Sequence, residues 1–173
     1  MPITAFSRVL ILSLIAVATC FGQSGDIPFT RAAIASLKGK NICDLQGQFL
    51  HSFGVYLNAK KEHLVEYRER DGVIALFLSE VKSTSDDCGT VEAVLDLTDV
   101  IKPNETTEFK CYTKHEGGTT WRHWGHIVAL ADNHQGKVRF VKGRLAWRVN
   151  IRQKRFEPIP SARVHCDTAG YED

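Results

Sequence analysis

The largest excess of positive charge in the sequence lies between Lys137 and Arg155. It contains eight cationic side chains and no acidic ones. Such a segment suits an anionic partner, because lysine and arginine pair with the charged groups of anionic polymers and surfaces. Three of the cations, Arg144, Arg148 and Arg152, follow one another at four-residue spacing and would share one face of a strand. The spacing therefore predicts a basic binding face built on these three arginines.

The partner that this face predicts is an anionic polysaccharide or a lipid surface. Nucleic acid fits poorly, because the chain carries an export signal and the basic segment lacks interleaved exposed aromatic residues. A plainer interpretation is that the cations face the acidic window between Ser85 and Glu108. That window holds seven acidic residues against one lysine. Opposite charges on neighbouring strands are ordinary stabilisers of a sheet.

Four histidines form the second group with chemical capacity: His115, His123, His126 and His134. They support an alternative function, a small secreted histidine-dependent hydrolase with or without a metal. On a strand, however, residues 123 and 126 point to opposite faces, which separates them as metal ligands. The sequence also lacks the common zinc, serine-nucleophile and phosphate-loop motifs. We therefore predict a non-enzymatic protein with no catalytic residue, no metal and no cofactor.

The three tryptophans are the third group. Trp147 shares its parity with Leu145, Val149 and Ile151 and is predicted to face a core. Trp121 and Trp124 have opposite parity on a strand, so one of them is expected on the surface, and we add Trp124 to the candidate binding residues. An exposed apolar patch without a pocket would instead indicate a third function, an inhibitor or interaction partner of another exported protein.

Composition and the N-terminus indicate an exported globular protein. The chain has 173 residues, 43% of them hydrophobic and 24% charged, with a net charge of +2 that by itself implies no partner. Arg8 precedes an apolar run over Val9–Ala18, and small residues allow cleavage before Gln23, as in a signal peptide. The run is too short to span a bilayer comfortably, and no other long apolar run follows. We expect a secreted or periplasmic protein; a retained anchor and lipidation of Cys20 are the alternatives.

The folded part would keep four cysteines: Cys43, Cys88, Cys111 and Cys166. An even number in an exported chain predicts two disulfides, and the absence of a C-x-x-C motif argues against a zinc or redox site. Four cysteines allow three pairings, among which the sequence does not choose.

Alternation of apolar and polar residues predicts mainly β structure. The clearest strand runs over Gly143–Arg152, with leucine, tryptophan, valine and isoleucine on one parity. A change of parity places a bulge or turn at Lys142–Gly143. Asp71–Gly72 predicts a tight hairpin turn. Other strands are predicted over Gln48–Leu57, His63–Arg70, Val73–Val81, Val91–Thr98, Thr107–Thr113, Thr120–Leu130 and Val138–Val141, with short edge pieces over Phe156–Ile159 and Ala162–Cys166.

These patterns predict one antiparallel barrel or sandwich of about eight short strands with a short N-terminal helix. The helix is expected over Thr30–Leu37, capped by Thr30 and ended by Gly39. We divide the chain into a signal peptide (1–22), a leader with the short helix (23–40), the β domain (41–166) and a polar tail (167–173).

Overall fold

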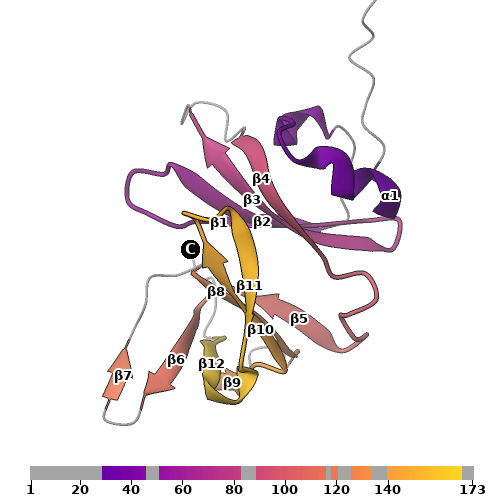
Figure 1. The fold of residues 1–173 in the computed structure, drawn as a ribbon. Helices are drawn as coiled ribbons and strands as arrows, with labels where there is room; N and C mark the ends of the chain where they lie inside the picture. The colour runs from indigo at the N-terminus through magenta and orange to yellow at the C-terminus, as the bar shows by residue number, and fades with distance from the viewer. Residues whose placement is uncertain are drawn as a thin grey trace, which may run out of the picture.

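The computed structural model describes residues 29–45, 51–82, 89–115, 118–120, 126–133 and 140–168. In these residues the fold is mainly β, with one short α-helix and three 3₁₀ turns. The strands form three four-stranded antiparallel sheets (Figure 1). The antiparallel β class is thus confirmed. Of the two predicted architectures, barrel or sandwich, no closed barrel forms in the described part of the chain, where each of the three sheets stays open, and more than the expected eight strands are present.

The first sheet follows the chain order. It consists of β1 (His51–Tyr56), β2 (His63–Arg70), β3 (Val73–Val81) and β4 (Gly89–Asp96). The turn between β2 and β3 is the predicted one. Asp71 and Gly72 have φ angles of 51° and 76°, a left-handed conformation that glycine adopts without steric cost and aspartate tolerates.

A short helical segment covers one face of the first sheet. Helix α1 (Arg31–Ile34) continues into a 3₁₀ turn over Ala35–Leu37. Thr30 caps the helix as predicted, since its hydroxyl accepts a backbone hydrogen bond from the first turn. The residues that end these two elements are fully buried beside Phe77 of β3. A helix of this length is held by such packing rather than by its own propensity.

The other two sheets are assembled from strands that alternate along the chain. The second sheet has the order β11 (Arg155–Ile159), β10 (Leu145–Asn150), β8 (Ile127–Asp132) and β5 (Glu105–Glu108). The third has the order β7 (Gly118–Thr120), β6 (Cys111–His115), β12 (Val164–Asp167) and β9 (Phe140–Lys142).

Three strand predictions are corrected by this arrangement. The stretch predicted as one strand over Thr120–Leu130 starts at the end of β7 in the third sheet and finishes in β8 of the second. The stretch predicted as one strand over Thr107–Thr113 is divided between β5 in the second sheet and β6 in the third. Strand β12 was expected at an edge but lies inside the third sheet, between β6 and β9. Strand β11, which contains Pro158, is an edge strand as expected, because proline has no N–H for a second ladder.

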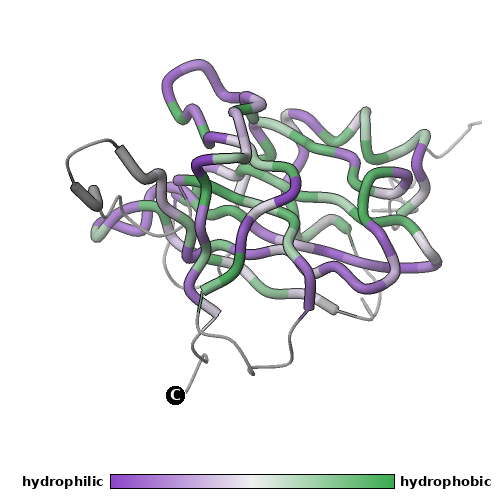
Figure 2. The backbone as a smooth tube through the Cα atoms, turned by 90° about the horizontal axis from the view of Figure 1, so that it is seen from below, coloured by the Kyte–Doolittle hydropathy of each residue, from purple (hydrophilic) through white to green (hydrophobic). Residues whose placement is uncertain are grey.

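The elements stack as four layers: helical segment, first sheet, second sheet and third sheet (Figure 1). A separate hydrophobic core fills each of the three spaces between neighbouring layers. Figure 2, which looks along the stacking direction, shows hydrophobic and hydrophilic stretches alternating along the chain, with a strongly hydrophilic loop at the top of the view. Strands β3 and β8 each contain runs of consecutive buried residues, because both of their faces are covered.

Trp147 faces the core, as the alternation predicts. Its side chain is 9% exposed and packs between the first and second sheets together with Val149. The opposite face of β10, however, is only partly exposed to solvent. Ala146 is buried against the third sheet, which the sequence did not indicate. The predicted change of parity falls where the chain leaves β9 and enters β10 in a different sheet.

One of the two expected disulfides is present, between Cys111 of β6 and Cys166 of β12. These two residues are direct partners in the register of the third sheet, and both are buried. Cys88 lies outside the described residues, so the second disulfide stays a prediction.

Candidate anion-binding hairpin

The C-terminal part of the basic segment lies in a β-hairpin at the edge of the second sheet, which we call the basic hairpin: β10, β11 and the turn over residues 151–154. Arg148 lies in β10, directly opposite Glu157 of β11. Because β10 ends at Asn150, Arg152 belongs to the turn. The expectation that three arginines continue along one strand face is therefore corrected: the strand is too short to include Arg152.

Arg144 precedes β10 and is held in an ion pair. Its guanidinium group contacts both carboxylate oxygens of Glu105, with 2.6 Å from Nη2 to Oε2, and donates to the carbonyl of Val100 at 2.7 Å. The Glu105 side chain is only 2% exposed. Hydrogen bonding to Arg144 lowers the pKa of that carboxyl below its usual value. Arg144 therefore pairs with a residue of the acidic window between Ser85 and Glu108, as in the alternative to a basic binding face.

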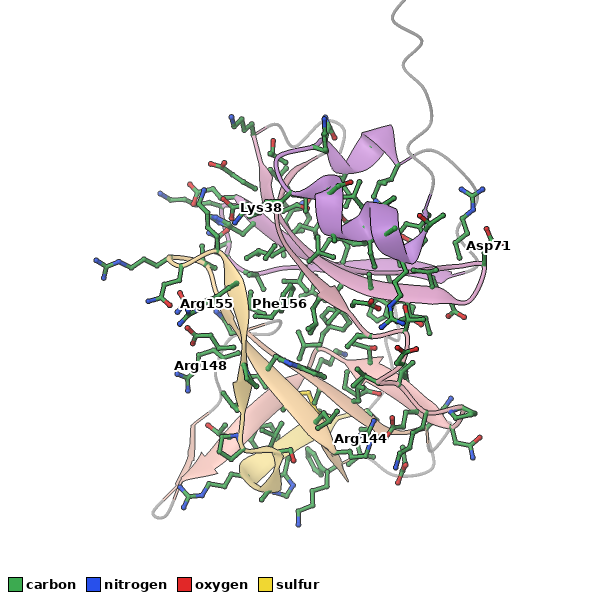
Figure 3. All side chains as sticks on the ribbon, turned by 45° about the vertical axis from the view of Figure 1, so that its right-hand side comes forward. Lys38, Asp71, Arg144, Arg148, Arg155 and Phe156 are labelled. Atoms are coloured by element: carbon green, nitrogen blue, oxygen red, sulfur yellow. A yellow bond between two sulfur atoms is a disulfide. The ribbon has the colours of Figure 1, made fainter. Side chains whose placement is uncertain are left out.

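Arg148 and Arg152 are exposed, and neither forms an ion pair with any residue that the structure describes. Figure 3 places Arg148 and Arg155 on one side of the molecule, away from Arg144. Arg148 and Arg152 are therefore the two exposed cations of the basic hairpin outside the described ion pairs, whereas Arg144 is bound to Glu105.

Lys154 ties the turn of the hairpin to the first sheet. Its ammonium nitrogen lies 2.6 Å from Oε1 of Glu92, whose side chain is 4% exposed. The Nε2 atom of His63 lies 3.6 Å from the other oxygen of this carboxylate. The Nδ1 atom of His63 is buried and has no hydrogen-bond partner among the described residues. The group is therefore an internal ion cluster that fixes the turn.

Sequence reasoning missed this cluster because alternation places Glu92 on the outer face of its strand. The register between β3 and β4 shifts between Leu78 and Ser79, which leaves Glu92 as the extra residue of a β-bulge. A bulge turns the strand locally, and here the carboxylate becomes buried. The one available signal was His63, which shares parity with the core residue Val65 of β2.

The predicted histidine and tryptophan candidates lie mostly outside the described residues, namely His123, His134, Trp121 and Trp124. The ring nitrogen Nε2 of His126 lies 3.0 Å from the carbonyl of Leu57. His115 belongs to β6 by its backbone. Across the described ranges, no group of three or more histidine, cysteine or acidic side chains is arranged to hold a metal ion. The hydrolase remains a prediction without a described site.

Comparison with known proteins identifies no relative: no family model, curated protein or solved structure matches this chain. In the part of the chain that the structure describes, no helix has both the length and the apolar character needed to cross a membrane.

The carboxyl group of Glu108 in β5 should make the free energy of unfolding depend on pH. Burial raises its pKa from 4.5 to about 7, although nearby Lys110 acts in the opposite direction. Between these two pH values the folded protein keeps a proton that the unfolded chain releases. The stabilisation by this proton is complete below pH 4.5 and is lost as pH rises through about 7.

We therefore expect Glu108→Gln to raise the free energy of unfolding at pH 8 by about 1–2 kcal/mol, after allowance for the partial exposure of the side chain, and to have little effect at pH 4. Urea unfolding at both pH values measures the effect. Glu62→Gln, at an exposed carboxylate, is the control. An equal effect of Glu108→Gln at both pH values would contradict the prediction.

Proposed function

We propose that this protein is an exported, non-enzymatic binding protein whose basic hairpin contacts an anionic polysaccharide. The observation that carries the proposal is the pair Arg148 and Arg152, which stand exposed and outside the ion pairs of the described residues. Arginine suits this role because its planar group donates two parallel hydrogen bonds to a carboxylate or sulfate.

A polysaccharide is a better partner than a lipid surface for this hairpin. Proteins that lie on membranes combine cations with exposed aromatic or aliphatic side chains, which enter the acyl boundary. Among the described residues, the only large hydrophobic side chain that is exposed is Phe140, and it belongs to β9 of the third sheet. The hairpin offers charge without an apolar anchor, which matches a hydrated polyanion.

The ion pairs within the fold limit the strength of this binding. Eight cations lie between residues 137 and 155, but Arg144 and Lys154 are bound to buried carboxylates. Arg155 is paired with Glu157. Within the basic hairpin itself, Arg148 and Arg152 lie outside the described ion pairs, so we expect about two ionic contacts from the hairpin. The logarithm of the binding constant should then fall with the logarithm of salt concentration with a slope of about −2.

The test is the double variant Arg148→Ser with Arg152→Ser. Each exposed charge pair contributes about 0.2–1 kcal/mol, so we expect a loss of about tenfold in affinity for dextran sulfate or polygalacturonate at low salt. Titration calorimetry measures the affinity. The control is Lys38→Ser with Lys40→Ser, which removes two exposed cations beside the helical segment. Equal loss in both double variants, or no binding by the unchanged protein, would reject the proposal.

Export also supports the second disulfide. With Cys111 bonded to Cys166, the other two cysteines of the folded part are Cys43 and Cys88. Asn41 forms a β-bridge with Thr90, which brings the segment of Cys43 to the start of β4. We propose that these two cysteines pair, and that removal of the signal peptide begins the mature chain at Gln23. Mass spectrometry of peptides from the secreted, non-reduced protein would show both features.

A further inference from the structure

Three hydrogen-bond donors of the basic hairpin converge on one oxygen of Glu157. Asn150 donates from Nδ2 to Oε1 at 2.8 Å. Arg155 donates to the same oxygen from Nε at 2.9 Å and from Nη2 at 2.8 Å. All of these side chains belong to the hairpin itself, so the arrangement does not depend on how the layers pack.

Arg148 stands on the same face as this donor group. Arg148 and Glu157 are direct cross-strand partners, and so are Asn150 and Arg155. Residues two apart on a strand share a face, which places all four side chains on one side of the hairpin. The labelled side chains Arg148 and Arg155 lie on the same side of the molecule in Figure 3. The face therefore carries two arginines and an asparagine around one carboxylate.

We propose that this face is an oxyanion site occupied by the protein's own Glu157, which a carboxylate or sulfate group of the polysaccharide displaces. The inference builds on the proposed function and names the binding chemistry. The guanidinium fork of Arg155 and the amide of Asn150 already meet a carboxylate oxygen at hydrogen-bond distance, so the donors have the spacing that such a ligand needs.

Occupation by Glu157 makes the site selective. A single dissolved anion must replace a carboxylate that is covalently part of the hairpin and therefore always close by. A polymer that already contacts Arg148 and Arg152 presents its next charged group at a similarly high local concentration. The internal carboxylate thus disfavours small anions and admits polyanions.

The direct test is Glu157→Gln, which keeps the size of the side chain and removes its charge. Arg155 then becomes available to the ligand. We expect at least fivefold tighter binding of dextran sulfate or polygalacturonate, and a salt slope steeper by about one. A larger gain in affinity for dextran sulfate would identify sulfate as the preferred group, and a larger gain for polygalacturonate would identify carboxylate.

The matched control is Asp71→Asn, which makes the same change in net charge. Asp71 lies in the turn of the first sheet, far from Arg155 in Figure 3, and also pairs with an arginine, Arg70. This variant should change the affinity less than twofold and leave the salt slope unchanged. Equal gains in the two variants would show a general charge effect and overturn the proposed site.

A second measurement keeps this inference separate from the proposed function. The Nε–H signals of Arg148 and Arg155 are followed by NMR during titration with sodium sulfate and with sodium acetate. In Glu157→Gln the Arg155 signal should shift at an anion concentration at least fivefold lower than in the unchanged protein. If it does so while neither polymer binds, the site stands and the proposed function fails. Equal titration in the two proteins overturns the site whatever the polymers do.

Discussion

Replacing both Cys111 and Cys166 with alanine is expected to lower the free energy of unfolding by about 4 kcal/mol. The two cysteines are 55 residues apart in sequence. Their disulfide removes conformational freedom from the unfolded chain, and a closed loop of this length corresponds to about 4 kcal/mol in the chain-entropy description. Urea denaturation of the unchanged and the doubly substituted protein, both in the absence of reductant, measures the difference.

The effect should be concentrated in the third sheet. Its core against the second sheet is made largely of alanine, valine and cysteine side chains, which bury little area per residue. Hydrogen exchange should therefore show a greater loss of protection in β6 and β12 than in β2 and β3. A loss below about 1 kcal/mol, or a uniform loss of protection, would mean that the disulfide does not hold this sheet in place.

Arg144→Met is expected to lower the free energy of unfolding by about 2–3 kcal/mol. The substitution leaves the buried carboxylate of Glu105 without its cation, and breaking a fully buried pair costs about 3–5 kcal/mol. The expected value is smaller because the Arg144 side chain is one-third exposed. Adding Glu105→Gln to the same protein should restore part of the loss, since no uncompensated charge then remains. Thermal and urea unfolding of the single and double variants form a double-mutant cycle.

Arg148→Met is the matched control, because this arginine is exposed and lies outside the described ion pairs. It should change the free energy of unfolding by less than about 0.5 kcal/mol. The order of the two variants should be reversed for polysaccharide binding. Arg148→Met should weaken binding, while folded Arg144→Met should bind as tightly as the unchanged protein. An Arg144 variant that keeps full stability and loses binding would place this arginine in the contact surface after all.

Local sequence patterns were sufficient to predict several strands. The bounds predicted for β2 and β3 are those of the structure, and Asp71–Gly72 forms the turn between them. The alternation around Trp147 correctly predicts its burial. In each case the pattern depends on residues close in sequence, whose side chains alternate between the two faces of a strand.

The assembly of the sheets was not predictable in this way. The stretch from Thr107 to Thr113 alternates as one strand, yet the chain passes from the second sheet to the third within it. Alternation shows which residues share a face and carries no information about which strand lies alongside. That choice depends on which arrangement covers the apolar faces best, and this is a property of the whole chain.

The candidate site was likewise predictable only in part from the sequence. Sequence alone determined that this is a mainly antiparallel β protein with a run of cations around a buried tryptophan. Only the tertiary structure decided which of those cations remain available. Glu105 is 39 residues from Arg144 in sequence, and Glu92 becomes buried through a bulge before it meets Lys154. Ion pairing acts over a few ångströms in space, so positions in sequence do not show which charges the fold itself neutralises.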